Sequence, residues 1–198
     1  MKNIRLATAS LAKKLALALA LICAAKFTAG AAVDLGAATD RTPYDRYLDP
    51  VQQVFSTLHA DSASMARVQS FMRQGRAFGY HHFDKFLPAT PELTATRQQG
   101  DCKDKALWLM NQMQDSNVRF VIGKFHRSSR ENHAWLMWQN GGQWWILDCT
   151  MVDHPIAADH VGADEYVPLF SYSRGMAFRH TEKAGLVADS GNRSKTGV

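Results

Sequence analysis

Three residues of this chain have side chains that together could perform nucleophilic chemistry on a carbonyl group. Cys102 offers a thiol, His133 an imidazole that can take its proton, and Asp148 a carboxylate that can hold the imidazole in one tautomer. A thiolate attacks a carbonyl carbon to form a thioester, and the imidazole delivers the proton to the leaving group. The sequence therefore predicts Cys102 as nucleophile, His133 as base and Asp148 as the residue that orients the histidine.

The residues around Cys102 predict a helix whose first turn contains this cysteine and which continues to about residue 114. Asp101 is a suitable N-cap, and Asp104, three residues later, completes the pattern of a capping box. In a first helical turn, free backbone N–H groups and the positive end of the helix dipole favour a thiolate. Lys103 and Lys105 act in the same direction, whereas the two aspartates oppose them.

The other two residues fall on a predicted β-hairpin. Residues 133–139 and 143–149 read as strands, and the Asn-Gly-Gly sequence at 140–142 is a strong turn signal between them. Across this turn His133 and Asp148 fall near the same end of the ladder, where the aspartate can hold the imidazole. We therefore expect the hairpin to present both residues to the N-terminus of the Cys102 helix.

The remaining pattern predicts an α+β fold. Apolar residues at helical spacing indicate helices that begin near Pro50 and near Ser62 or Ser64, with Gly75 and Gly79 ending the second one. Residues 80–99 have no clear pattern and read as a loop or short helix. Further strands are expected at residues 118–125, 166–172 and 176–180.

The N-terminus has the order of a secretory signal peptide. Basic residues precede an apolar run at residues 15–25, and small residues follow at 29–31. The apolar run is shorter than the roughly 20 residues that span a membrane. We predict a signal peptide at residues 1–31, an extended lead-in at 32–49, one catalytic domain at 50–180 and a disordered tail at 181–198. The protein is then exported, periplasmic or secreted, and not inserted in a membrane after cleavage.

The net charge of +5 belongs to the signal peptide rather than to the mature protein. Five of the 23 basic residues precede the predicted cleavage site, whereas all 18 acidic residues follow it. The mature chain therefore carries equal numbers of basic and acidic residues. This balance gives no reason to expect a nucleic acid or an anionic membrane surface as partner.

The motifs around the three residues resemble those of the bacterial transglutaminase-like cysteine proteinases (LapG-like), a branch of the papain-type superfamily. The matching sequences are GDCKDKA at residues 100–106, VRFVIG at 118–123, NHAWL at 132–136 and WILD at 145–148. The resemblance implies a papain/transglutaminase-like core, with the nucleophile at a helix N-terminus packed on an antiparallel β-sheet. It also implies a cysteine peptidase with Cys102, His133 and Asp148 as its triad.

The same resemblance implies a protein or peptide substrate and an inner-membrane regulator. Members of this group bind calcium through acidic residues near the nucleophile. Asp101 and Asp104 match such positions, whereas Gln98 and Gln99 supply no carboxylate. We therefore predict that no cofactor is required, with calcium at Asp101 and Asp104 as the alternative.

A thioester mechanism also needs donors for the oxyanion, and the backbone N–H of Cys102 is the expected first donor. Gln98, Gln99 and Tyr80 are candidates for the second donor, and the sequence does not rank them. Peptide hydrolysis, glutamine deamidation and acyl transfer to an amine share the same thioester. Proteolysis is the prediction among these three because the family resemblance implies it.

A disulfide is the main alternative to a catalytic cysteine. Cys102 and Cys149 both follow the predicted cleavage site, and small exported domains often contain disulfides. A bond between them would leave no nucleophile and would make the chain a non-catalytic binding domain. Adjacent strand residues point to opposite faces, so Cys149 faces away if Asp148 faces the helix terminus. This geometry favours the catalytic interpretation.

Two further alternatives concern histidines and tryptophans. A metal site would use histidines that show no recognisable ligand spacing. These are His81, His82, His126, His154 and His160. A substrate platform would use hairpin tryptophans, which more often pack a sheet on its helix. These are Trp135, Trp138, Trp144 and Trp145.

Overall fold

The computed structural model describes residues 33–59, 63–83 and 86–181. The predicted signal peptide lies outside these residues, and so does the predicted tail beyond Thr181. All of the predicted site residues fall within the described part of the chain. Among the described residues, no helix has the length and apolar character needed to cross a membrane.

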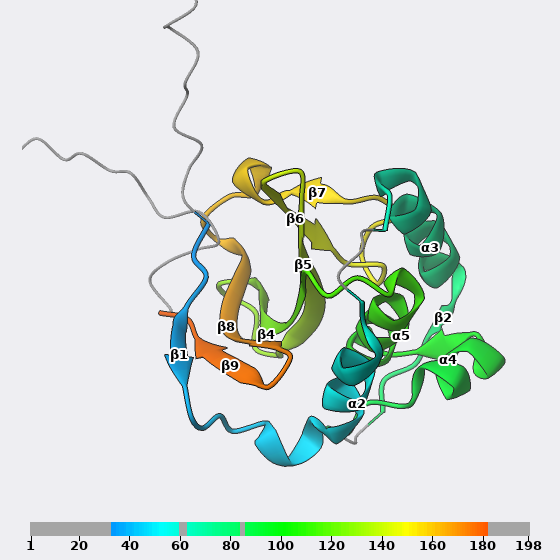
Figure 1. The fold of residues 1–198 in the computed structure, drawn as a ribbon, viewed down its shortest axis with the longest axis horizontal. Coiled ribbons are helices and arrows are strands. Elements are labelled where there is room, and N and C mark those ends of the chain that lie inside the picture. The colour runs from blue at the N-terminus through cyan, green and yellow to red at the C-terminus, as the bar shows by residue number, and fades with distance from the viewer. Residues whose placement is uncertain (1–32, 60–62, 84–85, 182–198) are drawn as a thin grey trace, which may run out of the picture. The chain divides into compact units, whose positions relative to one another are not determined.

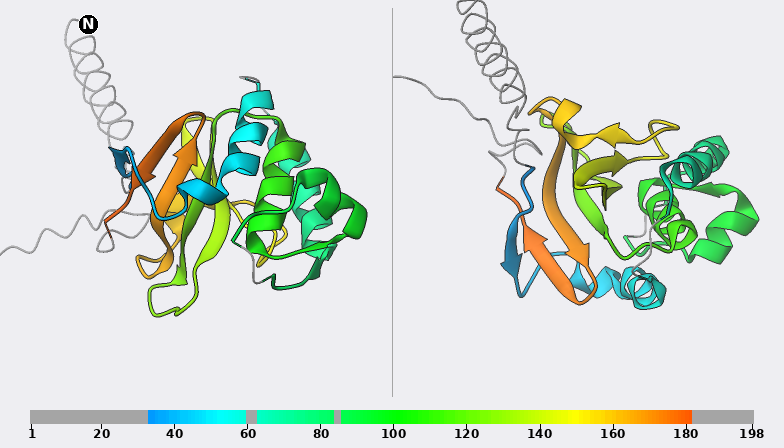
Figure 2. Two further views of the ribbon diagram at one scale, coloured as in Figure 1. Left: turned by 90° about the horizontal axis from the view of Figure 1, so that it is seen from below. Right: turned by 45° about the horizontal axis from the view of Figure 1, so that its top comes forward.

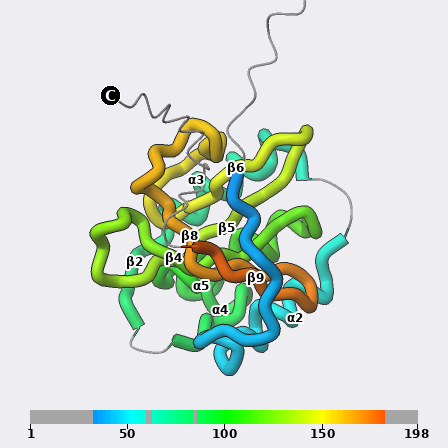
Figure 3. Tube along the Cα trace, turned by 90° about the vertical axis from the view of Figure 1, so that its left-hand side faces the viewer, coloured from blue at the N-terminus to red at the C-terminus, as the bar shows by residue number. Residues whose placement is uncertain are grey.

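An antiparallel sheet of seven strands forms one layer of the described fold (Figure 1). From one edge to the other its strands are β1 (Ala37–Thr39), β9 (Met176–Arg179), β8 (Glu165–Ser173), β4 (Val118–His126), β5 (His133–Asn140), β6 (Gln143–Leu147) and β7 (Ile156–Ala157). Figure 3 shows β1 beside β9, so segments from the two ends of the described chain meet at this edge.

The α-helices of the described chain lie on one face of this sheet (Figure 2). They are α2 (Asp49–Thr57), α3 (Met65–Ala77), α4 (Pro91–Arg97) and α5 (Cys102–Met113). Helix α5 contacts β5 and also packs against each of the other three helices. The predicted α+β class, with a helix packed on an antiparallel sheet, is therefore confirmed.

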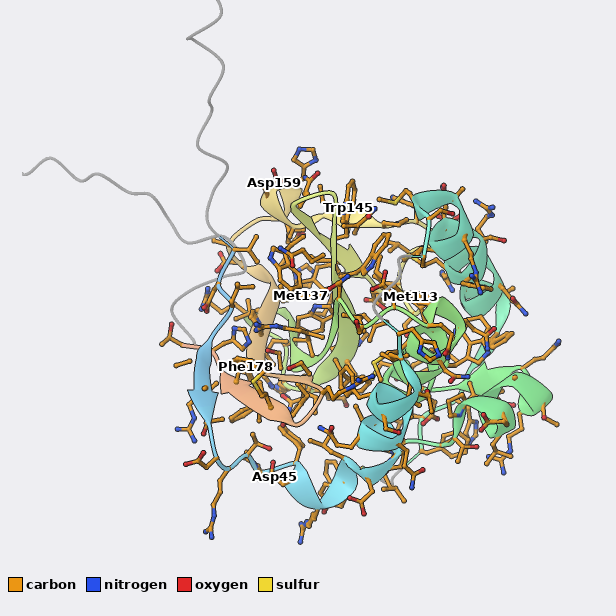
Figure 4. The ribbon with its side chains drawn as sticks, viewed as in Figure 1. Asp45, Met113, Met137, Trp145, Asp159 and Phe178 are labelled. Carbon is orange, nitrogen blue, oxygen red and sulfur yellow. The ribbon has the colours of Figure 1, made fainter. Side chains whose placement is uncertain are left out.

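Apolar residues fill both faces of the sheet. On the helix side, Met113 of α5 packs in one cluster with Leu136 and Trp138 of β5. On the opposite side, Trp135 and Met137 of the same strand belong to a second cluster. Figure 4 places Met113 and Met137 in the interior, where both are fully buried. Because β5 is covered on both faces, its side chains are apolar at successive positions rather than alternate ones.

The start of α5 matches the predicted capping box. The Asp101 side chain accepts the backbone N–H groups of Lys103 and Asp104, at 3.2 and 3.3 Å. The Asp104 side chain accepts the backbone N–H of Asp101 at 3.3 Å. These bonds satisfy N–H groups that a helix leaves unpaired, so they hold the first turn and Cys102 in place.

The predicted hairpin of β5 and β6 is also confirmed. Gly141 and Gly142 form its turn with φ angles of +62° and +80°, which glycine adopts without steric cost. The register pairs Leu136 with Leu147. Continued by one residue, this register places Asp148 opposite Trp135, two residues from the start of β5 on the same face.

Helix α3 differs from the sequence prediction because it runs through Gly75 instead of ending there. A Cβ atom at this position would lie 2.8 Å from Cys149 Sγ and 2.8 Å from Trp108 Cζ3. The glycine therefore allows the helix to approach its neighbours closely and does not mark a helix end. A sequence pattern cannot distinguish these two uses of glycine.

Two other segments contain more structure than the sequence pattern indicated. The predicted lead-in at residues 32–49 contains β1 and the short helix η2 (Asp45–Tyr47), so it forms part of the sheet. Within residues 80–99, α4 follows the two-residue strand β2 (Gly79–Tyr80), which pairs with β3 (Gln99–Gly100). Strands of two or three residues are too short to produce a readable period.

Candidate active site

Cys102 is the first residue of α5, and its side chain is partly exposed. The backbone N–H of a first helical residue has no partner within the helix. The thiol therefore lies beside an N–H that the helix itself does not pair, and at the positive end of the helix dipole. This position suits a nucleophile that becomes a thiolate, as the sequence predicted for a helix start.

Cys102 and His133 line the same cavity, which has a volume of about 430 Å³. Aromatic side chains form much of its wall. These are Tyr44, Tyr80, Phe83 and Phe86. Another cavity of about 480 Å³ lies near Asp45, which Figure 4 labels, and has neither residue in its wall. The cavity beside Cys102 is therefore the one that can bring a substrate to the thiol.

His133 begins β5 and is hydrogen-bonded to Asp148, with 2.7 Å between Nε2 and Asp148 Oδ2. This bond uses Nε2, so Nδ1 is the nitrogen available for the side-chain hydrogen bond of His133 with Cys102. The imidazole stacks on Trp135 at 6.0 Å between ring centroids, and Phe125 contacts it edge-on at 5.9 Å. The imidazole is therefore held by a stacked ring, an edge contact and a hydrogen bond through one nitrogen.

The surroundings of His133 favour its protonated form. Burial disfavours the charged imidazolium and lowers the pKa. The hydrogen bond to Asp148, the interaction with Cys102 and the negative charges of both outweigh burial and raise the pKa of His133 from 6.5 to about 10. A histidine that holds its proton beside a cysteine can stabilise a thiolate as its counter-ion.

Asp148 follows the last residue of β6 and is buried. Its Oδ1 atom accepts the backbone N–H groups of Thr150 and Met151, at 3.0 and 3.3 Å. Its Oδ2 atom accepts hydrogen bonds from His133 and from the hydroxyl of Tyr166, the latter at 3.0 Å. Every oxygen of the buried carboxylate is thus hydrogen-bonded, which a buried charge requires.

Tyr166 is a residue of this site that the sequence did not predict, and it contacts Asp148. It lies near the start of β8, and no motif links it to Asp148. Burial and the negative charge of Asp148 raise the pKa of Tyr166, so its hydroxyl keeps the proton that it donates. Only the strand order, which puts β8 beside β4 and β4 beside β5, could have brought it to attention.

The two cysteines that the sequence offered for a disulfide are both free. Cys149 is buried, and its Sγ lies 3.7 Å from the backbone oxygen of Lys105. Burial and the charge of Asp148 raise the pKa of Cys149 to about 12, so this thiol stays protonated. Cys102 is the cysteine that lines the cavity.

The candidates for a second oxyanion donor are placed differently from one another. Tyr80 lines the cavity with Cys102, whereas Gln98 and Gln99 are not in its wall. Gln98 is the C-cap of α4, and Gln99 pairs with Gly79 in the small sheet of β2 and β3. Burial and the charge of Cys102 raise the pKa of Tyr80, so its hydroxyl stays a donor.

The acidic residues considered for calcium already bind donors of the protein. Asp101 caps α5 and forms an ion pair with Lys103. Asp104 accepts the backbone N–H groups of Ala89 and Asp101. Calcium takes six to eight oxygen ligands, and a lysine ammonium beside one of them opposes a cation. A calcium ion at these two residues would have to compete with these donors, so calcium at Asp101 and Asp104 stays an alternative.

A metal site built from histidines and cysteines was another alternative from the sequence. Within residues 33–59, 63–83 and 86–181, no group of three or more His, Cys, Asp or Glu side chains is arranged to hold a metal ion. His154, one of the histidines considered, is hydrogen-bonded to Asp153 on the surface at 2.8 Å.

The substrate platform of hairpin tryptophans was a further alternative. Two of these residues, Trp135 and Trp138, are buried in the two cores.

The site combines a cysteine at a helix N-terminus with a histidine and an aspartate on an antiparallel hairpin, inside an α+β fold. No family model matches the sequence, and no curated protein sequence matches it. Among solved structures, the chain is similar to calcium-bound LapG from Legionella pneumophila. The TM-score is 0.49 with 13% identity, over 64% of this chain and 74% of that one.

Two further structures show a similar likeness. EGTA-treated Legionella pneumophila LapG gives a TM-score of 0.49 with 13% identity, over 65% of this chain and 73% of that one. A proposed cysteine protease from Cytophaga hutchinsonii gives 0.39 with 16% identity, over 71% of this chain and 58% of that one. At these identities the likeness concerns the fold, and the chemistry has to follow from the side chains of the site.

Proposed function

We propose that this protein is an exported cysteine hydrolase that cleaves an amide bond of a protein or peptide through a thioester, acting as a protease. The observation that carries this proposal is the chain of contacts from Cys102 through His133 to Asp148. The thiol end of this chain opens into a cavity, and the carboxylate end is buried. This order of groups is what nucleophilic catalysis by a thiol requires.

In the first step, the thiolate sulfur of Cys102 bonds to the carbonyl carbon of the substrate. The carbon–nitrogen bond then breaks, and the proton of the His133 imidazolium goes to the departing amine. A thioester on Cys102 and a neutral imidazole are the products. The raised pKa of His133 favours the imidazolium–thiolate pair that begins this step.

In the second step, water attacks the thioester carbon while His133 accepts a proton from that water. The carbon–sulfur bond breaks, a carboxylic acid leaves, and the imidazolium–thiolate pair is restored. Asp148 accepts the Nε2–H of the imidazole in both steps, which keeps Nδ1 directed at the sulfur and the substrate.

Each step forms an oxyanion that needs hydrogen-bond donors. The backbone N–H of Cys102 supplies one donor, since it has no partner within α5. We assign the second donor to the hydroxyl of Tyr80, because Tyr80 lies in the wall of the cavity that contains the thiol.

One experiment on a peptide pool distinguishes the three reactions that share the thioester. Hydrolysis of a peptide bond produces two fragments. Deamidation changes the mass of a glutamine without chain cleavage, and acyl transfer attaches an added amine. Mass spectrometry of the pool after incubation with the protein identifies the reaction, and the proposal predicts fragments.

The nucleophile is tested by the variant Cys102→Ala, with Cys149→Ala as a matched control. We expect Cys102→Ala to lower the rate of hydrolysis on the order of 10⁴-fold while the protein stays folded. Cys149→Ala removes a thiol outside the cavity and should retain activity. An iodoacetamide label should map to Cys102. Full activity in Cys102→Ala would refute the proposal.

The proposal includes export, because the first 31 residues have the order of a signal peptide. Fractionation of cells that produce the full chain tests it, since an exported protein leaves the cytoplasm and loses its N-terminal residues. The inner-membrane regulator implied by the family resemblance stays a prediction. Crosslinking of the protein in membranes, followed by mass spectrometry, tests for such a partner.

A further inference from the structure

Tyr166 has an unusual backbone conformation for a large side chain in a strand. Its φ angle is +46°, although it lies inside β8 and is not a glycine. Bulky residues rarely adopt a positive φ angle, and such conformations persist only where the surroundings impose them. The position of the Tyr166 side chain indicates which contacts require this backbone conformation.

The Tyr166 side chain is enclosed beside the His133–Asp148 pair. It is 4% exposed, and its ring contacts Phe125 at 5.1 Å and Trp135 at 5.4 Å between centroids. Phe125 and Trp135 are the same two rings that contact His133. Tyr166 therefore packs against the two rings that contact the imidazole.

The Tyr166 hydroxyl donates to Asp148 Oδ2 at 3.0 Å, the same oxygen that accepts His133 Nε2 at 2.7 Å. The other carboxylate oxygen is held by two backbone N–H groups. Without the tyrosine, Oδ2 would have His133 as its remaining donor. The hydroxyl thus fixes the direction of Oδ2 and shares its negative charge.

We propose that Tyr166 is a positioning residue for the reaction: its hydroxyl holds Asp148 so that the imidazole of His133 stays directed at Cys102. This inference rests on the proposed function of Cys102, His133 and Asp148. Loss of the hydroxyl leaves the carboxylate charge less stabilised, so the imidazolium holds its proton more tightly. The proton is then transferred less readily to the departing amine.

Other titratable groups also face this pair and stay unchanged in the test. They are Cys102 and Lys105 of α5, Cys149 beside Asp148, and Glu165 of β8. Any change in the pH profile on removal of the Tyr166 hydroxyl can therefore be assigned to its hydrogen bond with Asp148.

The test compares Tyr166→Phe with Tyr172→Phe in the full chain. Tyr172 lies on the same strand, is 1% exposed, and donates to Thr42 Oγ1 at 2.7 Å. Each variant removes one buried hydroxyl and keeps its ring. We expect Tyr166→Phe to lower kcat roughly 10- to 100-fold, the value of a hydrogen bond to a charged group, with KM nearly unchanged. In the plot of kcat against pH, the alkaline limb of Tyr166→Phe should move to higher pH. Tyr172→Phe should leave kcat and both limbs of this plot unchanged.

Alkylation of Cys102 by iodoacetamide across the pH range separates this inference from the proposed function. If the wild-type thiol shows no enhanced reactivity at neutral pH, the proposed function fails. If the wild type is reactive and Tyr166→Phe has the same pH profile and kcat, the positioning role alone is refuted. Equal changes in both variants would refute it too, since they would report a general effect of losing a buried hydroxyl.

A second measurement needs no variant. A hydroxyl proton that is buried and bonded to a carboxylate exchanges slowly and resonates downfield in the NMR spectrum. We expect such a signal from Tyr166, and we expect it to shift when Cys102 is alkylated, because the charge balance at Asp148 changes. A signal unaffected by alkylation would contradict the positioning role.

Discussion

The described part of the chain contains two pairs of histidine and aspartate that are largely shielded from solvent, and the two pairs differ in access and in charge. His133 is bonded to Asp148 at 2.7 Å beside the thiol of Cys102. His180 lies 3.4 Å from Asp34 and bonds the hydroxyl of Ser171 at 2.9 Å. Both sets contain a nucleophilic atom, an imidazole and a carboxylate in order.

The two sets differ in access. Cys102 lines a cavity, whereas Ser171 is completely buried and lies in the wall of neither described cavity. The Ser171 hydroxyl is therefore closed to a substrate carbonyl in this structure. The set around His180 links Asp34 of the segment before β1 to Ser171 of β8.

The two sets also differ in charge. At His133, the interactions with Asp148 and Cys102 outweigh burial and raise the pKa. At His180, burial lowers the pKa and outweighs the attraction of Asp34, which raises it. The positive charge of Arg119 also lowers the pKa. Each histidine lies beside a carboxylate and a thiol or hydroxyl, yet the surroundings favour the charged imidazolium at His133 and the neutral imidazole at His180.

Matched substitutions of the two histidines should break the comparison most clearly. We expect His133→Gln to lower the rate of hydrolysis on the order of 10³-fold or more, because the thiol loses its base. We expect His180→Gln to keep the rate within about twofold and to lower the free energy of unfolding by about 1 to 3 kcal/mol, because buried donors lose their partner. Peptide hydrolysis and urea unfolding of both variants provide the measurements. A large loss of activity in His180→Gln with little loss in His133→Gln would show that the chemistry had been assigned to the wrong pair.

The dependence of stability on pH should sharpen the comparison, because the two pKa shifts have opposite directions. Folded His133 keeps a proton that the unfolded chain releases above pH 6.5, so its contribution to stability is complete below that pH and is lost as the pH rises through about 10. Folded His180 releases its proton more readily than the unfolded chain. Its contribution is complete above pH 6.5 and is lost as the pH falls below it.

Urea unfolding of the wild type and both glutamine variants between pH 5 and 10 measures these contributions. As the pH falls into the acidic range, the free energy of unfolding of His180→Gln should decrease less steeply than that of the wild type. As the pH rises into the alkaline range, the free energy of unfolding of His133→Gln should decrease less steeply than that of the wild type. Equal slopes in all three proteins would contradict the assigned directions. The unfolding measurement does not depend on the proposed reaction, so it tests the electrostatics of the two pairs alone.

Local features of the fold could be predicted from the sequence because they depend on neighbouring residues. The capping box at Asp101 and the turn at Gly141 and Gly142 are examples, and both are confirmed. These two features fix the start of α5 and the register of the hairpin. They are the reason that the sequence could place Cys102, His133 and Asp148 together, although the catalytic role of the three stays a prediction.

Features that depend on strand order were not accessible to sequence reasoning. The hydrogen bond from Tyr166 to Asp148 and the pairing of β1 with β9 join segments that share no local pattern. The close approach at Gly75 is of the same kind, since the atoms it accommodates come from Cys149 and Trp108. Such contacts arise only when the whole sheet and its helices have assembled.

The smallest expected effect is that of calcium on the rate of hydrolysis. Calcium matters to the comparison because an ion near the cavity would change the charge around His133. A divalent ion held by Asp101 and Asp104 would stand beside the cavity and oppose the imidazolium, which would narrow the pKa difference between the two histidines. Both carboxylates instead accept backbone N–H groups, and Asp101 also pairs with Lys103. We therefore expect EGTA, and calcium added after it, to change the rate of hydrolysis by less than about twofold. Activity lost in EGTA and restored by calcium, but not by magnesium, would show that the charge balance at His133 includes an ion.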